Sequence, residues 1–123
     1  MNSLRQPPNK NKELILFVKW LEFLKWLLPV LEKFPKKSRF TITNRIENLA
    51  LDIVGLLIEA KYQKEKIHLL KKANLYLEKI RVLFRISHDM KFISTKAYNF
   101  SAKGINEVGA LLGGWLKQQK DNS

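Results

Sequence analysis

Apolar residues recur at alternating spacings of four and three in the middle of the chain, and this spacing constrains the fold more than any other feature. The residues are Ile42, Ile46, Leu49, Ile53, Leu56 and Ala60. Side chains spaced in this way form one stripe along an α-helix, as in the seam of a helical bundle. We therefore expect a helix that ends near Tyr62. It begins with Asn44 and Glu47 as a capping pair, or with Thr41 or Thr43 as the cap.

Two later segments carry seams of the same kind. In residues 64–91 the seam consists of Leu69, Ala73, Tyr76, Ile80, Leu83, Ser87 and Met90, with Leu70, Leu77 and Phe84 beside it. The other segment begins at Ser94 or Thr95 and ends near Gln118. Its seam consists of Tyr98, Ser101, Ile105, Val108, Leu112 and Trp115. Glycine inside a helix costs about 1 kcal/mol relative to alanine. Four glycines in the last segment therefore indicate either close approach to a neighbouring helix or unwinding around residues 113–114. These are Gly104, Gly109, Gly113 and Gly114.

The earliest helical segment, residues 12–33, is apolar over more than half of its circumference. Such a helix is either buried on both flanks or associates with another copy of the chain. Pro29 should kink it, and Pro35 ends it. We assign its surplus apolar face to an oligomer interface, together with one tryptophan near the end of the chain. The assigned residues are Phe17, Trp20, Phe23, Leu24, Leu27 and Trp115.

The same segment is interrupted by charged residues, which argues against a membrane span. Lys19, Glu22 and Lys25 lie within the apolar run. Each would cost about 2.5–3.5 kcal/mol at the centre of a bilayer. We therefore expect no membrane association and a cytoplasmic location.

Four such segments with short connectors predict an all-α, up-down antiparallel four-helix bundle over residues 12–118. The chain has only five glycines and four prolines in 123 residues, fewer than a β-sandwich or barrel would need for its turns. Residues 1–11 are expected to form a flexible basic tail, and residues 119–123 a disordered one.

The charge balance points to polyanionic partners. Lysine and arginine number 23 against 11 acidic residues, which gives a formal charge of +12. Such a surface attracts nucleic acid, or an acidic membrane to a lesser degree. The absence of cysteine excludes a disulfide scaffold, thiolate zinc sites and cysteine nucleophiles.

Two groups of cations are candidate phosphate contacts. One forms a stripe on the helix over residues 64–91, and the other lies in the connector before the second helix. The first group is Lys64, Lys71, Lys72, Lys79 and Arg85, and the second is Lys36, Lys37, Arg39 and Arg45. A lysine stripe neutralises phosphates without reading sequence. The alternative interpretation is a solvated surface helix, but the total charge favours polyanion binding.

Two further sets each have two interpretations. Asn74, Arg81 and His88 are spaced by seven. They form either a structural polar column, paired with Asp52 or Glu59, or a contact to phosphate or to a partner's acidic group. The tryptophans either stack on bases or belong to a core or interface. They are Trp20, Trp26 and Trp115.

Motifs for chemistry are absent from the sequence. It has no phosphate loop, dinucleotide fingerprint or metal-ligand spacing. His88 and Asp89 are adjacent on a helix and face different directions, so they make a poor catalytic pair. We expect no enzymatic activity, no bound metal and no cofactor.

Three stretches of the sequence together carry a resemblance to known proteins. They are LLPVLEKFPKKSRFTITNRI at 27–46, EAKYQKEKIHLLKKANLYLEKIRVLFRISHDMKFIS at 59–94 and GALLGGWLK at 109–117. These stretches resemble the accessory variability determinant (Avd) family of diversity-generating retroelements. They also resemble the broader four-helix-bundle family that includes the 23S rRNA intervening-sequence proteins. The resemblance covers residues 12–118.

The resemblance to Avd implies a homopentameric, barrel-like ring that binds the retroelement's reverse transcriptase and nucleic acid. Such a protein supports mutagenic reverse transcription and retrohoming. Arg81 and Arg85 stand where the family shows basic residues on its third helix, so the resemblance gives them the polyanion role first. Two alternatives stay open. One is a stand-alone bundle of the intervening-sequence type without a reverse transcriptase partner, and the other is a structural oligomer whose lysines only confer solubility.

Overall fold

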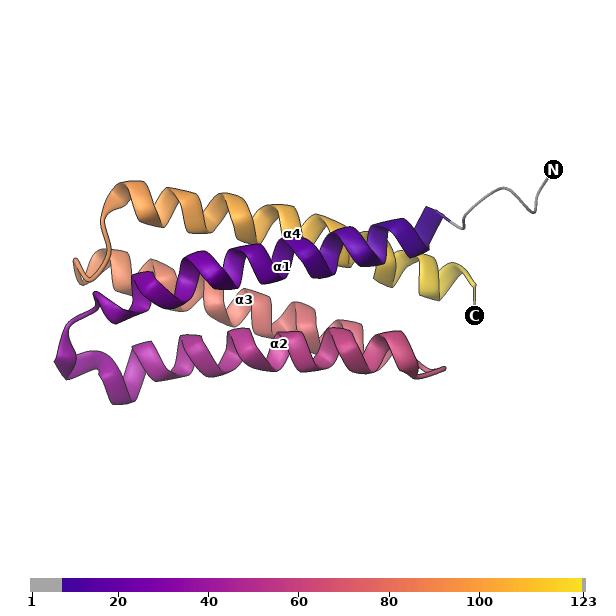
Figure 1. The fold of residues 1–123 in the computed structure, drawn as a ribbon, viewed down its shortest axis with the longest axis horizontal. Coiled ribbons are helices and arrows are strands. Elements are labelled where there is room, and N and C mark those ends of the chain that lie inside the picture. The colour runs from indigo at the N-terminus through magenta and orange to yellow at the C-terminus, as the bar shows by residue number, and fades with distance from the viewer. Residues whose placement is uncertain (1–7, 123) are drawn as a thin grey trace.

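Four α-helices run up and down in an antiparallel bundle in the computed structural model, which describes residues 8–122 (Figure 1). The helices are α1 (Pro8–Glu32), α2 (Asn44–Tyr62), α3 (Ile67–Asp89) and α4 (Thr95–Asp121). The described part of the chain contains no strand. Helix α3 packs closely against α2 and α4, whereas α1 packs against α4 and less extensively against α2. The predicted all-α four-helix architecture is confirmed.

The core consists of the expected seams with small changes. Every seam position predicted for the second and fourth helices is buried except Ile42, which precedes α2, and Tyr98 on α4, and both of these are half-buried. In α3 the seam is displaced, because Leu70, Leu77 and Phe84 are fully buried while Met90 is 55% exposed. Met90 lies just beyond the last turn of the helix, so the bundle no longer covers it.

Helix α1 buries its central stripe within the chain's own bundle. Trp20 is fully buried, and its Nε1 donates a hydrogen bond to the carbonyl of Ala50 on α2 at 3.0 Å. Phe23, Leu27 and, on α4, Trp115 are also buried. These four predicted interface residues are therefore core residues, because the chain's own helices already cover them. The wide apolar arc of α1 is explained in part by burial between α2 and α4.

The helix ends differ from the prediction by a few residues. Helix α1 begins at Pro8, so residues 8–11 are helical, and the rest of the predicted N-terminal tail lies outside the described residues. Helix α3 begins at Ile67 instead of Lys64. Helix α4 continues without unwinding to Asp121, so residues 119–121 are helical and not disordered. Ser94 caps α4 as expected, since its Oγ accepts a hydrogen bond from the Ala97 amide at 3.1 Å.

One of the four α4 glycines is explained by close packing. A Cβ on Gly104 would lie 2.6 Å from the ring of Phe23 on α1, so only glycine fits there without movement of the ring. Gly113 and Gly114 have open space where a Cβ would point. The close-approach interpretation therefore holds at Gly104, and the unwinding interpretation is wrong.

The connector between α1 and α2 is itself largely helical. It contains a 3₁₀ turn, η2 (Lys36–Ser38), and a π-turn, η3 (Arg39–Thr43), which leads directly into α2. Neither Asn44 nor the threonines cap α2 through a side chain, because the chain is already helical before it. The hydroxyls of Ser38 and Thr43 instead hydrogen-bond each other at 2.9 Å. This bond ties together the two ends of the turn.

Candidate nucleic-acid interface

All five cations predicted to form the stripe are exposed, and four of them lie on α3. Lys71, Lys72, Lys79 and Arg85 lie on α3, whereas Lys64 lies in the loop before it. The ammonium groups of Lys72 and Lys79 lie 5.8 and 5.4 Å from the ring centroid of Tyr76. The ring thus holds two cations one above the other along the helix. Arg85 Nε lies 3.5 Å from Asp89 Oδ2 in an exposed ion pair, which water and salt screen.

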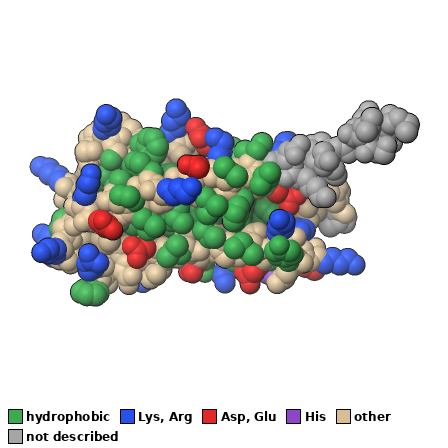
Figure 2. Space-filling model, viewed as in Figure 1, with side chains coloured by type: hydrophobic (Ala, Val, Ile, Leu, Met, Phe, Trp, Pro, Cys, Tyr) green, Lys and Arg blue, Asp and Glu red, His purple; other side chains and the backbone are tan. Residues whose placement is uncertain are grey.

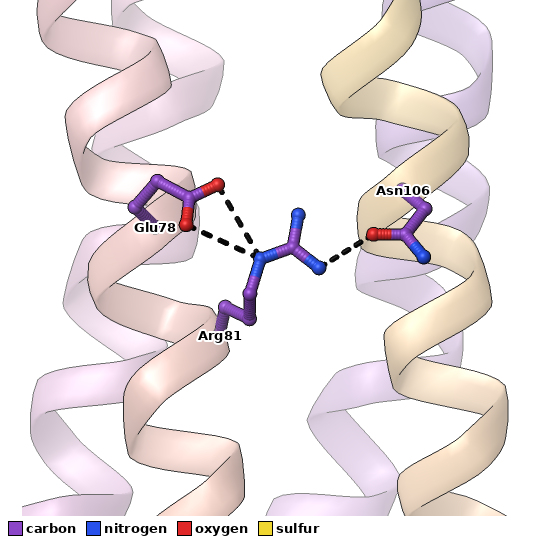
Figure 3. A network of polar contacts seen from close by, with 3 residues as sticks. All are labelled: Glu78, Arg81 and Asn106. Carbon is purple, nitrogen blue, oxygen red and sulfur yellow. Dashed lines mark hydrogen bonds and ion pairs between the residues drawn. The ribbon is translucent and has the colours of Figure 1, made fainter.

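Arg81 bridges two helices (Figure 3). Its Nε lies 3.3 Å from both carboxylate oxygens of Glu78, and its Nη1 donates to Asn106 Oδ1 on α4 at 2.5 Å. The side chain is 35% exposed. Arg81 is therefore a structural contact between α3 and α4, with partners other than the predicted Asp52 or Glu59.

His88 also has contacts within the chain. Its ring stacks on Tyr98 with centroids 4.5 Å apart, and its Nε2 lies 3.0 Å from Thr95 Oγ1. The third member of the predicted column, Asn74, is exposed on α3. Arg81 and His88 thus support the structural interpretation of this column.

The structure brings two loops together at one end of the bundle. The rings of Phe34, after α1, and Phe92, after α3, lie with centroids 6.0 Å apart. Figure 1 shows both connections at the same end, and Figure 2 shows lysine and arginine side chains gathered there. We call this surface the basic end. It comprises the exposed residues Lys33, Lys36, Lys37, Arg39, Lys91 and Lys96.

Three residues of the basic end were not among the sequence-based candidates: Lys33, Lys91 and Lys96. The available signal was topological, because in an up-down bundle the first and third connectors lie at the same end.

Lys91 also differs from the other residues of the basic end in its backbone conformation. It adopts a positive φ of 64°, a conformation that usually falls to glycine after a helix. The adjacent Phe92 amide donates to the Ser87 carbonyl at 2.8 Å and closes the end of α3.

An open hollow of about 730 Å³ lies between the start of α2 and the second half of α3. The turn before α2 contributes Phe40 and Ile42, and the helices contribute further apolar side chains. Arg45 and Lys79 also line it, as does Glu78, whose carboxylate is engaged by Arg81. The hollow thus combines an apolar lining with two cations from different helices.

The tryptophans do not provide a stacking surface. Trp20 and Trp115 are buried, and Trp26 is half-buried between the rings of Phe23 and Phe100, whose centroids lie 5.5 and 4.6 Å away. The interpretation as core or interface residues is favoured, since Trp20 and Trp115 belong to the core and Trp26 packs against it. The most exposed aromatic side chains of the described residues are instead Phe40, at 87%, and Tyr62, at 79%.

Two other features, a metal site and a membrane-spanning helix, are absent from residues 8–122. No group of three or more histidine, aspartate or glutamate side chains is arranged to hold a metal ion. No helix has the length and apolar character needed to cross a membrane.

Comparison with known proteins identifies the family. A family model described as bAvd-like matches residues 14–119, which include α2, α3, the connector before α2 and most of α1 and α4. The chain belongs to the bAvd-like family. The matched range contains the α3 stripe, the basic end and the hollow beside Phe40. A search of curated proteins found no match.

Proposed function

We propose that this bAvd-like chain is a non-catalytic accessory protein of a diversity-generating retroelement. It binds the reverse transcriptase and nucleic acid, and so supports mutagenic reverse transcription and retrohoming. The observation that carries the proposal is a strongly cationic four-helix bundle, formally +12, in a chain of this family. The protein acts by tethering, since holding template and enzyme together raises their effective concentration.

Nucleic acid binds to two exposed surfaces in this proposal. One is the α3 stripe, of Lys71, Lys72, Lys79 and Arg85, and the other is the basic end together with Arg45. Lys64 lies at the opposite end of the bundle and contributes to the general positive field. Arg81, which was expected to contact polyanions first, is occupied by Glu78 and Asn106 and acts by positioning α3 against α4.

The proposed homopentamer buries an apolar face formed by α1 and α2. Figure 2 shows hydrophobic side chains gathered where these two helices lie in Figure 1. The most exposed members are Leu14 at 62%, Val18 and Leu51 at 46%, and Ile58 at 44%. Around them lie the half-buried side chains of Phe17, Leu21, Leu24, Leu28 and Val54. Contiguous apolar surface of this kind marks an association site. We call it the α1–α2 face.

The α1–α2 face replaces most of the interface expected from the sequence. Phe17 and Leu24 remain in it, because they lie on the flank of α1 that is only half-buried. Exposed residues of α1 and α2 take the place of the four core residues. Self-association through this face leaves the α3 stripe available to nucleic acid, since α3 is not part of it.

Charge reversal tests the nucleic-acid part of the proposal. The variant Lys71→Glu, Lys72→Glu, Lys79→Glu and Arg85→Glu should lose most of its affinity for RNA while its helicity is unchanged. A matched control reverses Lys12, Lys25, Lys103 and Lys117, which are exposed on α1 and α4. It changes the net charge by the same amount and should bind more tightly than the stripe variant. Equal binding by the two variants would show that the stripe is not the binding surface.

Salt and co-purification test the remaining parts. Affinity for RNA should fall steeply between about 50 and 200 mM salt, because phosphate neutralisation releases counterions. The chain should co-purify with a reverse transcriptase encoded beside it. Nucleic-acid binding without a reverse transcriptase partner would favour the intervening-sequence type of bundle. If the chain binds neither nucleic acid nor a reverse transcriptase, the remaining alternative is a structural oligomer.

A further inference from the structure

Phe40 is the most exposed aromatic side chain of the described residues, and it is held on a fixed turn. The turn is closed by the hydrogen bond between the Ser38 and Thr43 hydroxyls. Ser38 Oγ also donates to the Pro35 carbonyl at 2.9 Å, and Thr41 Oγ1 donates to the Ser38 carbonyl at 3.2 Å. Three side-chain contacts in so short a segment hold its backbone in place. The ring of Phe40 is thus presented to solvent on a turn that three side-chain hydrogen bonds stabilise.

Phe40 lies beside an apolar hollow and is accompanied by several cations. The ring borders the hollow of about 730 Å³, which Ile42, Leu49, Val82 and Leu83 line with apolar atoms. A hollow of this size falls within the range of small-molecule sites. Cations accompany the ring in the hollow and in the turn before it. Arg45 and Lys79 line the hollow, and the exposed residues Lys36, Lys37 and Arg39 precede Phe40 in the chain.

This combination fits a nucleotide better than it fits a peptide helix. A base is a flat ring that stacks on an aromatic side chain, and the phosphate that accompanies it is matched by lysine or arginine. The one carboxylate in the lining belongs to Glu78, and Arg81 neutralises it. The hollow therefore presents a net positive rim to a chain that carries one negative charge for each ring.

We propose that the hollow beside Phe40 binds unpaired nucleotides of single-stranded nucleic acid. Phe40 stacks on a base, and the cations of the hollow and of the preceding turn contact the flanking phosphates. The inference rests on the proposed nucleic-acid function and adds that this site selects unpaired bases, whereas the α3 stripe contacts phosphates alone. A duplex keeps its bases stacked on each other and offers none to Phe40.

Fluorescence anisotropy with the full chain tests the inference. Three labelled probes are compared. The first is an oligothymidylate of about 12 nucleotides, a length within the usual range of binding-site sizes on single strands. The others are an abasic strand with the same number of phosphates and a duplex of the same length. Wild type should bind the oligothymidylate about tenfold more tightly than the abasic strand. Phe40→Ala should lose this preference, with its affinity for the abasic strand unchanged. Phe40→Trp should retain it.

The matched control is Tyr62→Ala. Tyr62 is 79% exposed, has lysines nearby in sequence and lies at the opposite end of the bundle. Its removal should leave all three affinities unchanged. Circular dichroism of each variant checks the fold, and the exposure of both rings predicts no loss of helicity.

Each other outcome has a defined meaning. If Phe40→Ala binds all probes as wild type does, while reversal of Lys36, Lys37 and Arg39 abolishes binding, the proposed function stands and the inference fails. If Phe40→Ala weakens only the capture of the reverse transcriptase, the hollow is a protein-docking surface and the inference is overturned. If wild type binds none of the probes in low salt, the nucleic-acid function itself fails.

Discussion

Arg81 on α3 and Asn106 on α4 are joined by a hydrogen bond of 2.5 Å between Nη1 and Oδ1. The same guanidinium meets Glu78 one turn earlier. Arg85, one turn later, has only an exposed partner in Asp89. Two arginines to which the family resemblance gives the same expected role therefore have different surroundings. One fixes the packing of two helices, and the other is available to a partner.

The first prediction separates these two arginines. Arg81→Ala should lower the free energy of unfolding by about 1 kcal/mol, because it removes a partly exposed charged hydrogen bond. Arg85→Ala should change stability little, since exposed ion pairs contribute little. Arg85→Ala should weaken RNA binding more than Arg81→Ala does. Urea denaturation and anisotropy titration measure the two quantities.

A double-mutant cycle with Asn106→Ala tests whether the loss of stability in Arg81→Ala comes from the hydrogen bond between Arg81 and Asn106. If the pair is coupled, the double variant should be less destabilised than the sum of the single variants, by about 0.5 kcal/mol or more. Additive effects would show that the two side chains act independently. A stronger RNA defect in Arg81→Ala than in Arg85→Ala would reverse the roles assigned here.

The second prediction concerns the glycines of α4. Gly104→Ala should destabilise the fold by about 1–3 kcal/mol, because its Cβ would lie 2.6 Å from the buried ring of Phe23. Gly113→Ala should instead stabilise it by about 0.5–1 kcal/mol, since the position is helical and has open space around it. Thermal unfolding of both variants measures the contrast.

A compensating change checks the cause of the Gly104 effect. Phe23→Leu shortens the side chain that the new Cβ would meet. Phe23→Leu should lower the free energy of unfolding less in the Gly104→Ala background than in the wild-type background. A larger cost in the double variant would mean that the Phe23 ring is not the source of the strain.

The third prediction concerns the end of α3. Lys91 adopts a φ of 64°, which costs a residue with a Cβ about 1 kcal/mol. Lys91→Gly should therefore raise the free energy of unfolding by about that amount. Lys91→Ala removes the same charge but keeps the Cβ, so it should bring no such gain. Differential scanning calorimetry compares the three proteins, and equal stability of both variants would remove backbone strain as the explanation.

Much of the bundle follows from the sequence because helical periodicity is local. The seam of α2, from Ile46 to Ala60, needs only the spacing of its apolar residues. Burial of Trp20 depends on Ala50, thirty positions away, and the spacing within α1 does not reveal which part of a wide apolar arc faces the core. The same limit explains why four of the six residues that the sequence assigns to an oligomer interface belong to the core.

The candidate site was predictable only where its parts are close in sequence. The stripe on α3 is local and was found, apart from Lys64. The basic end joins residues near Lys36 with residues near Lys91, and the contact between Phe34 and Phe92 brings them together. The exposure of Phe40 depends on a π-turn, and sequence patterns for helices and caps do not encode such a turn.

The last prediction tests the α1–α2 face. Leu51 is 46% exposed on α2 and lies in this face. Leu51→Lys places a charge where the proposed oligomer buries apolar surface, and an unpaired buried charge disfavours association strongly. Analytical ultracentrifugation should therefore show that the sedimenting mass falls towards the 14.5 kDa of one chain.

Met90→Lys is the matched control, because Met90 is 55% exposed but lies beyond the end of α3, outside the face. It should leave the mass of the assembly unchanged. The two variants carry the same new charge, so only its position differs. If Leu51→Lys sediments as wild type does, or if both variants dissociate equally, the copies do not meet through α1 and α2. If wild type already sediments as one chain, no ring forms, and the apolar side chains of this face have another partner.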